Sequence, residues 1–346
     1  MKKLVLIMML LLLFAVPVDA VEIEPVEPPD SALDRMPETS GNFGQDLWYV
    51  IRSAVFTLRP DLAEGFGVCL RVFSVAALMA LLKSYDGAGK SAVELAGVVS
   101  ISCILLQSAG SMIRLGVDTV QEISRYGTLL LPVMAAGLAA QGGTASSAAL
   151  YAGTAVFDTL LTNAISKVLV PMVFIFLVLG ILNAATGENQ IKRLQDIVKW
   201  LMVWFLKILM YLFTGFISIS GVVSGSADQA ALKATKLTIS GAVPVVGSIL
   251  SDASEAILVS VGLAKNAAGV YGILAVIAIF IGPFLTLAVQ SAMLKFTAVI
   301  CGVVSDERST QVIECFSGAM RFLLGMTGAA CLLQLISTVC FMKGMG

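Results

Sequence analysis

Three charged side chains lie within or beside long apolar runs of the sequence, where a charge is unexpected. They are Arg71, Asp158 and Lys207. A charge at membrane depth is costly, so such a residue commonly belongs to an ion path, a proton relay or a contact between helices. The long stems of Arg and Lys can instead carry their charges to the lipid headgroups. The three residues are therefore candidates for pore lining or partner contact, with snorkelling or helix pairing as the alternative.

The residue types on which many enzymes depend are missing from the sequence. Histidine is absent, which removes Ser–His and Cys–His nucleophilic pairs and histidine-based metal sites. No HExxH, P-loop or GxSxG pattern occurs, and Asp158 has no obvious second carboxylate at membrane depth. We predict no enzymatic activity, no cofactor and no metal site. The net charge of -1 offers no basic surface for nucleic acid.

The cysteines also suggest packing rather than chemistry. None of them forms a CxxC pair, and most lie in apolar stretches, where cysteine behaves as a small hydrophobic residue. Disulfide frameworks are typical of small secreted domains, which this chain is not. The six cysteines are Cys69, Cys103, Cys301, Cys315, Cys331 and Cys340.

The first 20 residues have the pattern of a secretory signal peptide. Lys2 and Lys3 precede an apolar run over residues 4–16, and Pro17 follows it. A cleavage site between Ala20 and Val21 fits this pattern, and the run is too short for an ordinary membrane span. The alternative is an uncleaved anchor.

An acidic, proline-rich segment follows over residues 21–46. Such a composition cannot bury enough apolar area to fold, so we expect an extended tail on the extracytoplasmic side. Residues 47–346 would then form a multi-spanning membrane domain, because the chain is 58% hydrophobic and only 13% charged, against about 25% charged residues in soluble domains.

Six apolar stretches are long enough to be membrane spans. Four contain no charged residue, at 95–113, 168–185, 266–294 and 322–342, and two contain basic residues, at 65–82 and 197–223. They pair into three hairpins with polar turns at 83–94, 186–196 and 295–314. If the tail is outside, all three turns are cytoplasmic, with a modest excess of basic residues there.

Two further apolar segments, 126–157 and 237–251, are interrupted by proline, glycine and polar residues. Each is predicted to be two short helices around a polar tip, either re-entrant or lying in the interface, because broken backbone at membrane depth needs protein or water around it. Whether 127–163 and 237–264 cross the membrane stays open. We expect helix breaks at Pro132, Pro171, Pro244 and Pro283.

The same prolines suggest a weak internal repeat. Pro132 and Pro244 are 112 residues apart, as are Pro171 and Pro283, although chance is an equal explanation in so apolar a chain. The predicted fold is an all-α polytopic membrane protein of about six to eight transmembrane helices in three hairpins, with two broken hairpins.

Four short segments are distinctive: GTLLLPVM at 127–134, TISGAVPVVG at 238–247, SDAS at 251–254 and VVSDER at 303–308. In these segments, the signal peptide and the acidic tail, the chain resembles the stage III sporulation protein AE family of endospore-forming bacteria. The run SGAVPVVG at 240–247 is the most specific of them. The resemblance covers most of the mature chain and carries over no catalytic motif.

The resemblance implies a location and a set of partners. The protein would lie, as a multi-pass protein, in the mother-cell membrane that surrounds the forespore. It would join other membrane proteins of the same sporulation operon, and a forespore channel partner, in a channel or secretion-like apparatus that supports forespore development and late gene expression. The alternative, suggested by the residues alone, is a stand-alone solute permease.

Overall fold

The structure, a computed structural model, describes residues 26–37, 43–84, 90–140, 144–219, 267–304 and 307–344. Within these ranges every regular element is a helix, and the order is α2 (Asp30–Leu33), α3 (Phe43–Thr57), α4 (Arg59–Ser84), α5 (Lys90–Ala140), α6 (Thr144–Ala164), the π-helical turn η1 (Ile165–Leu169), α7 (Val170–Thr186), α8 (Asn189–Ile219), α11 (Ala267–Val304) and α12 (Glu307–Gly344). The predicted signal peptide with Ala20 and Val21, the segment 237–251 and Pro244 lie outside these residues.

The six predicted spans are confirmed as helices within the described ranges. Six helices are long and apolar enough to cross a membrane: Arg59–Ser84, Ala92–Gly137, Ala148–Thr186, Asn189–Ser218, Gly269–Val303 and Glu307–Lys343. Each contains all or most of one apolar stretch found in the sequence. The chain is therefore an all-α polytopic membrane protein.

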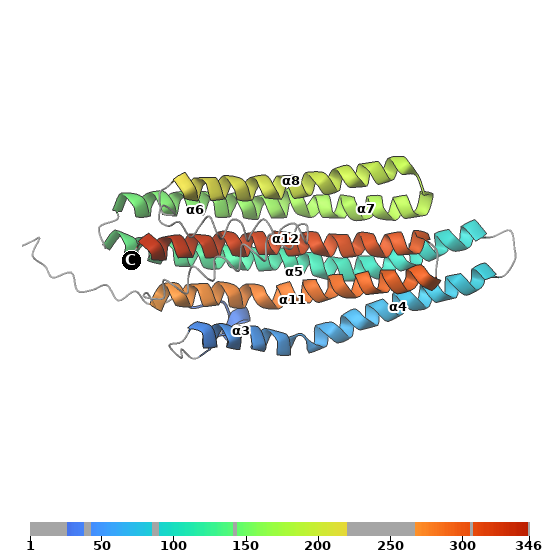
Figure 1. Ribbon diagram of the computed structural model, residues 1–346, viewed down its shortest axis with the longest axis horizontal. Helices are drawn as coiled ribbons and strands as arrows, with labels where there is room; N and C mark the ends of the chain where they lie inside the picture. Colours follow the sequence, from blue (N-terminus) through green and yellow to red (C-terminus); the bar gives the residue numbers. More distant parts are fainter. Residues whose placement is uncertain are drawn as a thin grey trace, which may run out of the picture.

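The helix α12 occupies the middle of the bundle. It packs against α11, α5, α7, α6 and α8, and these helices run alongside it in Figure 1. Almost all of its most apolar stretch is buried, as expected for a helix that is apolar on all sides. Its large buried side chains include Phe316 and Phe341, so the axis of the bundle is filled with protein.

The described residues of the three predicted hairpin turns lie at one end of the bundle, as expected if all three turns are on one side of the membrane. Helix ends that flank them lie together at the right-hand end of Figure 1. Arg308 connects all three: its Nε lies 3.5 Å from a carboxylate oxygen of Glu94, and its Nη1 donates to the carbonyl of Ala185 at 3.2 Å. Lys83 also pairs with Glu94, which joins α4 to α5.

Glycine closes the second of these turns. Gly187 has φ 72°, a left-handed conformation that suits glycine at the end of a helix. Its N–H donates to the carbonyl of Asn183 at 2.8 Å, so α7 ends there and α8 can begin at Asn189.

The expected helix breaks at Pro132 and Pro283 are wrong. Pro132 lies inside α5, which runs for 51 residues, or about 76 Å at 1.5 Å per residue, and Pro283 lies inside α11. The segment 126–157 is therefore not a pair of short helices but the end of α5 and the start of α6. Proline is tolerated within membrane helices because packing against neighbours offsets the lost hydrogen bond.

Pro171 marks a change of winding rather than a break. It follows η1 and occupies the first turn of α7, and because proline lacks an N–H it removes one backbone hydrogen bond from the helical path. The helical path nevertheless continues from α6 through η1 into α7. The internal repeat stays a prediction, because Pro244 is not among the described residues.

The acidic tail is not wholly extended. Residues 30–33 form α2, where Ala32 is fully buried, and Arg35 donates from Nη1 to the carbonyl of Ala278 in α11 at 3.1 Å. Tyr126 of α5 donates to the carbonyl of Val26 at 3.2 Å. One buried alanine and two hydrogen bonds dock this segment on the bundle, which composition alone did not reveal.

Replacing Arg308 with alanine tests the connection between the three turns. We expect Arg308→Ala to lower the free energy of unfolding in detergent by about 1 kcal/mol, because the ion pair and the hydrogen bond are partly solvent-exposed. The measurement is a thermal melt followed by circular dichroism. Arg193→Ala is the control, since Arg193 is an exposed residue at the same end; equal melting of both variants would contradict the connection.

Candidate functional site

The three charged residues singled out in the sequence lie on three different helices. Arg71 is exposed on α4, Asp158 is buried in α6 and Lys207 is exposed on α8. The Nε of Arg71 donates to the carbonyl of Gly67 in its own helix at 3.2 Å. The structure therefore does not gather the three residues into one site, and the described side chains do not pair them with one another.

Asp158 is part of a buried polar cluster. It is 6% exposed and accepts a hydrogen bond of 2.6 Å from Ser124 Oγ of α5. Thr154, one turn earlier in α6, is fully buried, and no described residue is a hydrogen-bond partner for its hydroxyl. Ser124 could not be found from the sequence, because nothing there fixes how α5 and α6 are aligned.

Gln334 of α12 approaches the same part of α5. Its side chain is fully buried, and neither amide atom has a hydrogen-bond partner among the described residues. Its amide lies against Gly127, one turn beyond Ser124, where a Cβ atom would come within 2.3 Å of Gln334 Oε1. Glycine at position 127 thus permits the close approach of a polar side chain from the central helix.

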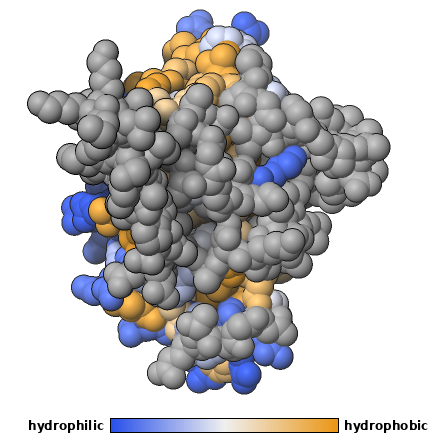
Figure 2. All heavy atoms as spheres, turned by 90° about the vertical axis from the view of Figure 1, so that its left-hand side faces the viewer, coloured by the Kyte–Doolittle hydropathy of each residue, from blue (hydrophilic) through white to orange (hydrophobic). Residues whose placement is uncertain are grey.

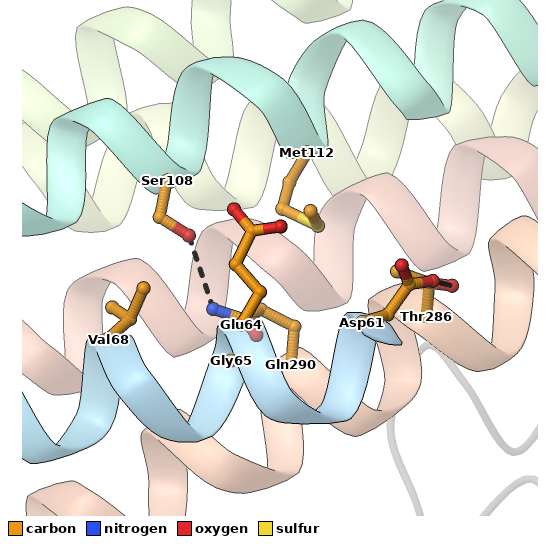
Figure 3. A pocket seen from close by; sticks show the side chains of 8 residues that line it. All are labelled: Asp61, Glu64, Gly65, Val68, Ser108, Met112, Thr286 and Gln290. Atoms are coloured by element: carbon orange, nitrogen blue, oxygen red, sulfur yellow. Dashed lines mark hydrogen bonds between the residues drawn. The ribbon is translucent and has the colours of Figure 1, made fainter. Parts of the chain in front are cut away.

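A second polar site lies between α4, α5 and α11, where eight residues line a small pocket (Figure 3). Thr286 Oγ1 donates to Asp61 at 2.7 Å, and Gln290 Nε2 donates to Ser108 Oγ at 3.2 Å. Hydrogen bonds of this kind hold helices together in membranes. The pocket has a volume of about 20 Å³, room for one water molecule and far less than the roughly 300 Å³ of a small-molecule site.

Sequence analysis missed this pocket because Thr286 and Gln290 lie in an uncharged apolar run. Their separation of four residues places both on one face of α11, which is the signal that could have found them. Gly65 of α4 makes room for Gln290: a Cβ at Gly65 would lie 2.5 Å from Gln290 Oε1.

The cysteines take no part in either polar site. Cys301, Cys315, Cys331 and Cys340 are buried, whereas Cys103 is exposed, and none is in a disulfide. Within the described ranges, no group of three or more cysteine or acidic side chains is arranged to hold a metal ion.

The fold and these sites define a class of protein. It is a polytopic helical membrane protein whose described interior carries polar contacts between helices and the buried carboxylates Asp46 and Asp158. The sequence profile of the family described as stage III sporulation protein AE matches residues 33–344. The chain belongs to this family, which confirms the resemblance seen in the sequence and supports a role in sporulation.

A curated relative agrees with this assignment. The chain is 24% identical to the stage III sporulation protein AE of Bacillus subtilis (strain 168) over 237 residues, which is 68% of this chain and 59% of the relative. The match thus spans less than two thirds of the relative's length. No solved structure matches the chain.

Two glycines of α4, two residues apart, allow a matched test of the polar pocket. We expect Gly65→Ala to destabilise the protein by about 1 kcal/mol, because the new methyl group displaces Gln290 and breaks its hydrogen bond with Ser108. Gly67→Ala is the control: a Cβ there meets nothing within 4 Å, and alanine favours a helix by up to about 1 kcal/mol over glycine. Thermal melts in detergent measure both.

A double-variant cycle separates this mechanism from general overcrowding. If the loss arises from the broken Gln290–Ser108 hydrogen bond, Gly65→Ala destabilises a Ser108→Ala background less than it does the wild type. An equal loss in both backgrounds contradicts the mechanism.

Proposed function

We propose that the protein is a non-enzymatic subunit of a multiprotein channel or secretion-like apparatus that links mother cell and forespore during sporulation. It acts in the mother-cell membrane around the forespore, reached through a cleaved signal peptide, together with other membrane proteins of the same sporulation operon and a forespore partner. Family membership supports the sporulation role; the channel, the compartment and the partners are our proposal.

The observation that favours a subunit over a stand-alone permease is the filled centre of the bundle. A permease needs a solute-sized cavity between its helices, near the middle of the membrane. Here α12 occupies that position with its side chains buried on nearly all sides. The polar pocket between α4, α5 and α11 holds only about 20 Å³. The described part of one chain is therefore better suited to a structural subunit of a larger assembly than to a carrier that binds a solute within itself.

Deletion of the gene tests the sporulation role. We expect vegetative growth to be unchanged and spore maturation to be blocked after engulfment, with recovery when the intact gene is supplied at another locus. The measurement is the yield of heat-resistant spores. A normal yield from the deletion strain would remove the proposed function.

Reconstitution distinguishes the subunit from a permease. The purified chain in proteoliposomes should not move hydrophilic solutes alone and should do so only with its partners. Solute uptake by the isolated chain would favour the permease.

Cysteine accessibility at Ser146 and Glu307, which lie at opposite ends of the bundle, tests the orientation of the chain in the membrane. We expect Glu307→Cys to react only from the cytoplasmic side.

A further inference from the structure

The acidic tail reaches α11 with one charged side chain. Arg35 is the only basic residue between positions 21 and 46, and its Nη1 donates to the carbonyl of Ala278 at 3.1 Å. The guanidinium presents its flat face to Gly282, because a Cβ atom there would lie 2.8 Å from Arg35 Cζ and 2.9 Å from both Nη1 and Nη2. A larger residue at position 282 would therefore displace the arginine.

The contact falls on a turn of α11 that lacks one backbone hydrogen bond. Pro283 lies in the interior of this helix and has no N–H, so it cannot donate to the carbonyl of Ile279, four residues before it. A proline in such a position tends to kink a helix, yet α11 is continuous from Ala267 to Val304. Arg35 brings N–H donors to positions 278 and 282, directly beside the missing bond.

A second contact supports the same part of α11 from α4. Thr286 Oγ1 donates to the carbonyl of Gly282 at 3.2 Å and to a carboxylate oxygen of Asp61 at 2.7 Å. The turn that follows Pro283 is thus held by α4, and the turn that precedes it is held by the tail. Because α4 is a long helix of the bundle, whereas α2 in the tail has only 4 residues, the tail is the support that can detach while the bundle stays folded.

Water can reach the docked tail. Arg35 is half-buried, and its neighbours Leu33 and Asp34 are exposed. Figure 2 looks along the bundle from the end at which α11 begins, and hydrophilic side chains lie among hydrophobic ones on that face. An arginine released from α11 would therefore be hydrated, so detachment of the tail does not leave its charge in an apolar environment.

We infer that Arg35 is a latch: by docking on α11 it stabilises the helix where Pro283 interrupts the hydrogen bonds. In the docked state α11 keeps its continuous form, and in the released state the turn around Gly282 opens more readily. The state of the tail is thereby coupled to the conformation of α11, which packs against α3, α4, α5 and α12. The inference does not depend on the proposed function, because it concerns a single chain.

The order of the chain determines when the latch can form. Arg35 and Ala278 are 243 residues apart in the sequence, so most of the chain is synthesised between the donor and its acceptor. The tail cannot dock on α11 until α11 has joined the bundle. The latch therefore forms late in the assembly of the protein.

Hydrogen exchange of the purified chain in detergent, followed by mass spectrometry of its peptides, tests the latch. We expect Arg35→Ala to speed exchange in peptides that contain Gly282 by about tenfold, as for the loss of one hydrogen bond from a charged group. Arg52→Ala is the control, since Arg52 is an exposed arginine of α3 that lies over the ring of Phe56. Its removal should leave exchange in these peptides unchanged.

Gly282→Ala provides a second test, in which the sign of the effect identifies the contact. Alanine is a better helix former than glycine, so in an Arg35→Ala background the substitution should slow exchange in α11 by about fourfold. When Arg35 is present, the new methyl group displaces it, and exchange should instead become faster by about twofold. Only a direct contact between Arg35 and Gly282 predicts this reversal.

Three results would overturn the inference. Slower exchange of Gly282→Ala in both backgrounds would show that the arginine does not rest on α11. Faster exchange of Arg35→Ala in the tail alone would show that Arg35 fastens the tail without supporting the helix. Equal acceleration by Arg52→Ala would show a general loosening instead of a latch. Because each measurement uses the purified chain, none of these results depends on whether the deletion strain forms spores.

Discussion

The burial of α12 is the constraint on which the remaining structure depends. This helix is mostly apolar but carries buried polar side chains such as Gln334, and five other helices cover it. In a membrane the hydrophobic effect does not drive such association, so close packing and polar contacts must do so. Two glycines of the neighbouring helices permit this close packing. Gly127 of α5 lets Gln334 of α12 lie against its backbone, and Gly180 of α7 does the same for Cys315 of α12. The outer helices then take their positions from α12 and from one another.

The sequence was sufficient to predict the elements that depend on composition. Apolar runs of span length became the six long helices, and the polar turns between them became one end of the bundle, where Arg308 meets Glu94 and Ala185. These features are local, because they follow from length, charge and hydrophobicity. Family membership followed from short runs such as 127–134, which need no structure to recognise.

What depends on packing could not be predicted. Pro132 looked like a break because proline removes a backbone hydrogen bond, but contacts along α5 keep the helix continuous through it. The docking of Arg35 on α11 and the pairing of Ser124 with Asp158 each require the relative alignment of two helices, which no sequence pattern fixes.

The continuity of α5 through Pro132 has a mechanical consequence. A helix of 51 residues is more than twice as long as the roughly 20 residues that cross a bilayer, and its neighbours α11 and α12 each have 38. Tilting by the usual 20° or so does not absorb such an excess. The helices of the bundle therefore project from at least one membrane surface. A force on the projecting part is transmitted along the helix axes to the part within the bilayer.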